Sequence, residues 1–125
     1  MSEITRLWHE DGKPRNYTAT ATFGSVVWAC GQVPTLPDGS TPETITEQVD
    51  AVFDNLETVL AAAGADLSTI LKVTVFLADL DEFDAYNEAY LKRLDKVVLP
   101  PRTTVEVARF RGAKRIEMDV VAAVH

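Results

Sequence analysis

A long stretch of helical periodicity, followed closely by a run of β-branched residues, constrains the fold more than any other feature of this sequence. Apolar residues recur every three or four positions between Ile45 and Ala63, and Gly64 ends the pattern. That spacing places them on one face of an amphipathic helix. Residues 70–77 read Ile-Leu-Lys-Val-Thr-Val-Phe-Leu, which is typical of a strand. The pattern therefore predicts helices packed against a sheet.

Capping signals predict where the two helices begin. Thr41 is a candidate N-cap of the first helix, because Pro42 suits the first helical position. Asp79 or Asp81 begins the second helix, with further acidic residues in its first turn. The apolar residues that this helix turns toward the core are Phe83, Tyr86, Tyr90, Leu91 and Leu94.

Four further strands complete the predicted fold. Residues 17–23 and 26–31 are separated by a Gly-Ser pair, which predicts a hairpin. Residues 103–110 and 115–124 follow a Pro-Pro break. The order ββαβαββ predicts one α+β domain over residues 1–125, with two helices on one face of a mixed sheet. Several strands are apolar on both faces, so we expect a partner subunit to cover the second face.

Composition excludes several classes of function. The net charge of −7 and the absence of a basic run with interleaved aromatics disfavour nucleic-acid binding. Cys30 is the only cysteine, and His9 and His125 lie near the two ends, so we expect no disulfide, no metal site and solvated histidines. No apolar run is long enough for a membrane span and no signal core is present, so we expect a cytoplasmic protein.

Two charged residues are the strongest candidates for a binding site. Arg102 follows two prolines, which restrict the backbone at the start of a strand and so limit where the guanidinium lies. A fixed guanidinium suits a planar carboxylate, although a surface arginine on a strand edge is the competing interpretation. Glu117 and Asp119 share one strand face, which is either a solvated acidic face or part of a site.

The order of several separate motifs resembles the Rid family of reactive-intermediate imine deaminases, also called YjgF-like or L-PSP proteins. The resemblance runs from about residue 17 to the end of the chain. The segments that carry it are Cys30-Gly31-Gln32-Val33-Pro34, Asp54-Asn55-Leu56, Ala62-Ala63-Gly64, Lys72-Val73-Thr74-Val75-Phe76-Leu77, Asp79-Leu80, Asn87, Pro100-Pro101-Arg102, Val105-Glu106-Val107-Ala108 and Ile116-Glu117-Met118-Asp119.

This resemblance implies a homotrimer of chorismate-mutase-like subunits with a small-molecule site in each cleft between subunits. The implied activity is cofactor-independent hydrolysis of 2-imino or 2-enamino acids to 2-oxo acids and ammonia. By the same resemblance, Arg102 holds the substrate carboxylate and Glu117 orients the water or the imine nitrogen. The substrate-binding positions that it implies are Arg102, Tyr17, Cys30, Gly31, Asn87 and Thr104.

Each of these positions also has a purely structural interpretation. Asn87 could bond a neighbouring backbone, Tyr17 could be a core aromatic, and Thr104 is an ordinary strand residue. Cys30 replaces a serine that is common in the family, and is either a small apolar residue or a thiol that alters substrate choice. We expect no thiolate nucleophile, because no histidine is near Cys30 in the sequence.

Arg15-Asn16 also departs from the family pattern, and Arg15 is the one nearby candidate for a second cation that would select a dicarboxylic substrate. Three functions stay open on the sequence alone. The first is the imine or enamine deaminase, and the second is a non-catalytic carboxylate-binding or regulatory protein. The third is an endoribonuclease or translation inhibitor, for which an acidic chain offers little chemistry.

Overall fold

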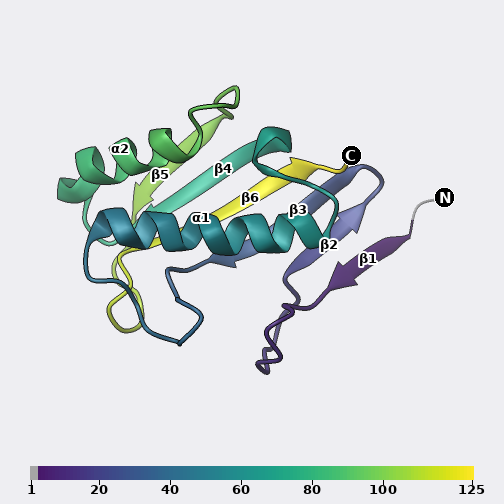
Figure 1. Cartoon of the computed structure of the whole chain (residues 1–125), viewed down its shortest axis with the longest axis horizontal. Coiled ribbons are helices and arrows are strands. Elements are labelled where there is room, and N and C mark those ends of the chain that lie inside the picture. The colour runs from purple at the N-terminus through teal and green to yellow at the C-terminus, as the bar shows by residue number, and fades with distance from the viewer. Residues whose placement is uncertain (1–2) are drawn as a thin grey trace.

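Two helical crossovers determine how the sheet is built. The computed structural model of the chain describes residues 3–125, and α1 (Ile45–Ala62) links β3 (Val26–Gln32) to β4 (Ile70–Leu77). α2 (Phe83–Arg93) links β4 to β5 (Arg102–Glu106), which pairs with β4 in parallel. Both crossovers step in the same direction across the sheet, so both helices lie on the same face (Figure 1).

The other strands pair antiparallel. β6 (Ile116–Ala123) comes last in the chain and lies between β3 and β4. β2 (Thr20–Phe23) forms a hairpin with β3, and β1 (Ile4–Leu7) pairs with β2, which gives the order β1-β2-β3-β6-β4-β5. The predicted α+β fold, with two helices on one face of a mixed sheet, is confirmed. β1 was not predicted, because its four residues are too few and too exposed to show a burial pattern.

The core lies between the sheet and the two helices. α1 turns Val52, Phe53, Leu56 and other apolar residues toward the sheet, and these are buried. β6 alternates strictly between buried and partly exposed residues, and β4 does so from Lys72 onward. The buried set faces the helices and consists of Val73, Val75, Leu77, Ile116, Met118, Val120 and Ala122. Alternation then turns the remaining residues of β6 to the opposite face of the sheet.

Several predicted boundaries are wrong by a few residues. The N-cap of α1 is Thr44 and not Thr41, because Thr44 and Glu47 form a reciprocal capping box. The predicted strand at residues 17–23 begins only at Thr20, and the one at residues 103–110 ends at Glu106. Asp79 caps a short 3-10 helix that precedes α2.

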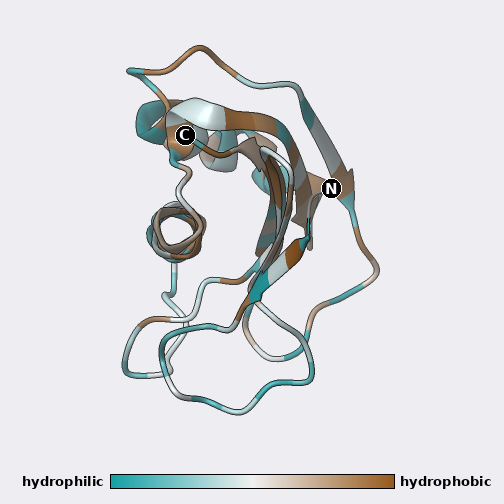
Figure 2. Ribbon diagram, turned by 90° about the vertical axis from the view of Figure 1, so that its right-hand side faces the viewer, coloured by the Kyte–Doolittle hydropathy of each residue, from teal (hydrophilic) through white to brown (hydrophobic). Residues whose placement is uncertain are grey.

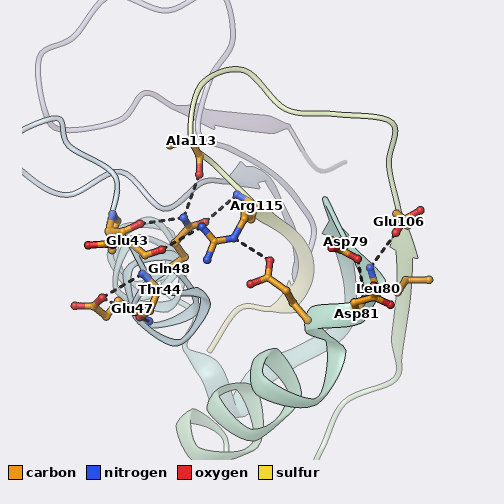
Figure 3. Close-up of polar contacts among 12 residues, drawn as sticks. Glu43, Thr44, Glu47, Gln48, Asp79, Leu80, Asp81, Glu106, Ala113 and Arg115 are labelled. Atoms are coloured by element: carbon orange, nitrogen blue, oxygen red, sulfur yellow. Dashed lines mark hydrogen bonds and ion pairs between the residues drawn. The ribbon is translucent and has the colours of Figure 1, made fainter.

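A buried amide ties the start of β6 to both helices (Figure 3). Gln48 of α1 is fully buried, and its Nε2 donates to the carbonyl of Ala113 over 3.1 Å while its Oε1 accepts from the N–H of Arg115 over 2.8 Å. Nε of Arg115 donates to Glu82, directly before α2, over 2.8 Å. These bonds fix the point at which β6 enters the sheet, and with it the position of Glu117.

The face of the sheet opposite the helices carries large exposed apolar side chains. Figure 2 shows α1 end-on at one side of the curved sheet, and residues 3–125 place no helix on the other side. Phe23 and Trp28 are 52% and 47% exposed there, and Ile4 and Val105 share the same face by register. An apolar surface of this kind is typical of an interface between chains.

Candidate functional site

Arg102 is held in place by an amide and three aromatic rings of α2. It pairs in register with the buried Val73, so its side chain lies on the helix face of the sheet. Its Nη1 donates to Oδ1 of Asn87 over 2.7 Å. The guanidinium carbon lies 4.6 Å from the ring centre of Tyr90 and 5.5 Å from that of Tyr86, with Phe83 slightly farther away. Cation–π contact and the Asn87 bond together orient the fork of donors.

Two hydroxyl groups lie beside this guanidinium. The Tyr86 hydroxyl and Oγ1 of Thr104 are 2.9 Å apart, within hydrogen-bond distance. The Tyr90 hydroxyl is buried and has no hydrogen-bond partner among the described residues. Burial raises the pKa of Tyr86, and it raises that of Tyr90 to about 12, so both phenols are neutral near pH 7. We call Arg102, Asn87, Thr104, Tyr86 and Tyr90 the arginine cluster.

Glu117 lies on the other face of the sheet, against Gly31. It pairs in register with Phe76, one position away from the buried Met118, and so points away from the helices. A Cβ atom added at Gly31 would overlap Oε2 of Glu117 and come within 2.8 Å of its carboxyl carbon. A side chain at position 31 would therefore collide with the carboxylate of Glu117. Burial, and then the charge of Asp119, raise the pKa of Glu117.

Tyr17, His9 and Cys30 lie on the same side of the candidate site as Glu117. The rings of His9 and Tyr17 meet edge to face, with centres 6.4 Å apart, and Nε2 of His9 lies 3.9 Å from Sγ of Cys30. The expectation that His9 is a solvated surface residue is thus wrong, because β1, which pairs with β2, brings the N-terminal segment to this part of the sheet. We call Glu117, Gly31, Cys30, His9 and Tyr17 the glutamate cluster.

Electrostatics around Cys30 do not favour a thiolate. Burial raises the pKa of the Cys30 thiol, and Nε2 of Gln32 contacts the sulfur at 3.4 Å. Burial also lowers the pKa of His9, so the imidazole is neutral where a thiolate–imidazolium pair would need it charged. The pair is therefore two neutral groups in contact, and the expectation that Cys30 is no nucleophile stays a prediction.

A cavity of about 480 Å³ lies between residues 9–17, the end of β3 and the side of α1 that carries Asn55, Thr58 and Val59, and the glutamate cluster borders it through Gly31, His9 and Tyr17. His9, Tyr17 and Gly31 line it together with Arg15, which had been singled out from the sequence. The guanidinium of Arg15 is already engaged, since Nη1 and Nη2 each donate to a different oxygen of Asp11 over 2.8 Å. Sequence reasoning had missed Asp11, although its spacing of four from Arg15 was visible.

The seven candidate residues thus fall into two groups on opposite faces of one sheet. Arg102, Asn87 and Thr104 lie with α2, whereas Glu117 points to the other face and lies near Gly31 and Cys30. Gly31 and Tyr17 line the cavity, and the structure does not bring the two groups together within one chain. Tyr86 and Tyr90, predicted as core residues, also contact the candidate site.

Between residues 3 and 125, no three His, Cys, Asp or Glu side chains are grouped so as to hold a metal ion. In the same range, no helix is both long enough and apolar enough to cross a membrane.

Comparison with known proteins identifies the family. Residues 12–124 match the family model described as Endoribonuclease L-PSP. TdcF of Escherichia coli strain K12, whose name describes it as a reactive intermediate deaminase, is 30% identical over 125 residues, covering 98% of this chain and 97% of TdcF. The chain belongs to the Rid (YjgF/L-PSP) family. Relatives named RutC family proteins and a mitochondrial protein of Saccharomyces cerevisiae, MMF1, match as well.

Solved structures of Rid-family proteins share the fold along nearly the whole chain. The crystal structure of yeast Mmf1 is 30% identical and superposes with a TM-score of 0.89, covering 98% of this chain and all of that one. The crystal structure of Escherichia coli TdcF with bound serine is 28% identical, with a TM-score of 0.89 over 97% of this chain and all of TdcF. The ligand of that TdcF structure is thus a small molecule that carries a carboxylate.

Proposed function

We propose that this Rid-family protein hydrolyses 2-imino acids, or their enamine tautomers, to 2-oxo acids and ammonia. The observation that carries the proposal is a guanidinium fixed by Asn87 and three rings, with donors left over for a carboxylate. A second support is the half-buried carboxyl group of Glu117, whose pKa is raised by burial, the direction that a group exchanging protons with the substrate needs. The serine bound to the related TdcF supports a small carboxylate as ligand.

We further propose that one site is assembled from two subunits of a homotrimer. Arg102 and Glu117 point to opposite faces of the sheet, so one chain cannot direct both at the same small molecule. The exposed apolar face that carries Trp28 and Phe23 offers a surface for another copy. In a closed ring, the arginine cluster of one subunit would meet the glutamate cluster of the next.

The proposed reaction needs no group beyond those two clusters and water. Arg102 binds the substrate carboxylate through a charge-assisted fork. The substrate reacts as the imine protonated on nitrogen. Glu117, when ionised, takes a proton from water as the water oxygen bonds to the C=N carbon, which gives a neutral carbinolamine. Glu117 returns this proton to the amino nitrogen, the C–N bond breaks as the hydroxyl group becomes the carbonyl, and the hydroxyl proton passes to Glu117 and then to solvent as ammonia leaves the 2-oxo acid. Thr104 and the backbone around Gly31 contact the substrate on either side.

The test is to generate 2-iminopropionate in situ with an amino-acid oxidase and to follow the appearance of pyruvate. We expect the wild-type protein to accelerate hydrolysis and Arg102→Ala to lose most of the effect while keeping its fold and assembly. Arg102→Lys is the matched variant, because it keeps the charge but loses the fork. Equal rates for wild type and Arg102→Ala would contradict the role of Arg102.

Carboxylate binding without hydrolysis is the second candidate, favoured by the serine-bound structure of TdcF. In that case Glu117→Gln would leave ligand affinity unchanged, and no imine would be hydrolysed faster by wild type than by buffer. The ribonuclease activity in the family description fits this chain poorly, because a net charge of −7 repels a phosphate backbone.

A further inference from the structure

Arg15, which lines the cavity beside the glutamate cluster, forms a bidentate ion pair with Asp11. Arg15 directs both Nη atoms at Asp11, and the N–H of Lys13 donates to the same carboxylate over 3.1 Å. Hydrogen bonding to Asp11 raises the pKa of Arg15, and the same bonds hold the pKa of Asp11 well below its usual range. Both groups are therefore charged near neutrality, and together they contribute no net charge.

The charges around this cavity leave little to attract a second carboxylate. Arg15 and Glu117 both lie near the thiol of Cys30. The charge of Arg15 lowers the pKa of this thiol, and the charge of Glu117 raises it. His9 is neutral near pH 7 because burial lowers its pKa. Lys13 lines the cavity from an exposed position, where water and salt screen its charge. A distal carboxylate entering here would meet an arginine that is already paired and the acidic side chains of Glu10 and Asp11.

We propose that Asp11 is a specificity-determining residue, which occupies Arg15 and thereby makes the site favour substrates with one carboxylate over those with a second, distal one. The inference rests on the proposed function, in which Arg102 binds the first carboxylate. Without the partner at position 11, Arg15 would present its fork to the cavity that Tyr17 and Gly31 also line. The proposal places the distal part of a longer substrate in this cavity.

Asp11→Asn tests this directly, because the amide keeps the size of the side chain and removes its charge. The activities to compare are hydrolysis of 2-iminobutyrate and of 2-iminoglutarate, each generated in situ, and binding of the stable 2-oxobutyrate and 2-oxoglutarate by calorimetry. We expect wild type to favour the monocarboxylate. We expect Asp11→Asn to raise the ratio of dicarboxylate to monocarboxylate use about 5- to 10-fold. This is the size of change expected when Arg15, a partly exposed ion-pair partner, becomes free to bind a carboxylate.

Glu10→Gln is the matched control, since it removes the same charge from an exposed residue of the same segment and cavity. We expect it to change the ratio much less than Asp11→Asn. Asp11→Ala serves as a second variant, because asparagine retains one acceptor for Arg15. An unchanged ratio in both Asp11 variants, or equal use of both substrates by wild type, would overturn the inference. If wild type hydrolysed neither imine, the proposed function would be contradicted. The ratio of 2-oxoglutarate to 2-oxobutyrate affinity measured by calorimetry would still test the role of Asp11.

Discussion

Replacing Asn87 by Asp should weaken substrate binding without destabilising the protein. The carbonyl oxygen of Asn87 accepts from Nη1 of Arg102 over 2.7 Å. An aspartate in the same place would neutralise the guanidinium that the substrate carboxylate is proposed to bind. Two unit charges 4 Å apart interact by about 4 kcal/mol at an effective dielectric of 20. Both residues are partly exposed, so we expect about 1–2 kcal/mol, which corresponds to a rise in KM of about 5- to 30-fold.

The assay is steady-state kinetics with 2-iminopropionate, together with chemical denaturation. Because the new ion pair forms in the folded protein, the free energy of unfolding should stay the same or rise by up to about 1 kcal/mol. Loss of a merely structural amide would instead lower stability along with activity. Asn87→Ala is the matched variant, which frees Nη1 without adding charge. An unchanged KM in Asn87→Asp would refute the reasoning that this amide sets the charge available at Arg102.

Three other predictions concern single side chains. Gly31→Ala should fold, because the atoms that it displaces are the far end of the flexible Glu117 side chain. Its kcat should nevertheless fall by about tenfold or more, because the carboxylate moves. A near-normal kcat would contradict that contact. Tyr86→Phe should cost about 1 kcal/mol in urea denaturation, and a double-mutant cycle with Thr104→Val should show coupling between the two hydroxyls. Asp119→Asn removes a charge that raises the pKa of Glu117. If kcat falls on acidification because Glu117 becomes protonated, that fall should move to lower pH in the variant. An unmoved pH profile would mean that another group titrates.

Local signals predicted the fold better than they predicted the site. The helical spacing from Ile45 and the β-branched run at Ile70–Leu77 each bury one face, so a single segment was enough to reveal them. The contact of His9 with Cys30 depends instead on β1, a four-residue edge strand without alternation. Likewise, no spacing in the sequence indicates that Tyr86, which looks like a core residue, bonds Thr104 and flanks Arg102. Long-range pairing creates these contacts, and local patterns do not encode it.

The placement of Arg102 and Glu117 on opposite faces makes mixed assemblies the sharpest test of a shared site. Arg102→Ala keeps the glutamate cluster, and Glu117→Gln keeps the arginine cluster, so each variant alone should be inactive. In a ring where each site takes one cluster from each of two neighbours, random 1:1 mixing leaves about one quarter of sites with both wild-type residues. Unfolding the two variants together and refolding them should therefore restore about one quarter of wild-type activity, whereas mixing without subunit exchange should restore none. If each chain carried a complete site of its own, every site would lack one residue, and co-refolding would give no more activity than the separate variants.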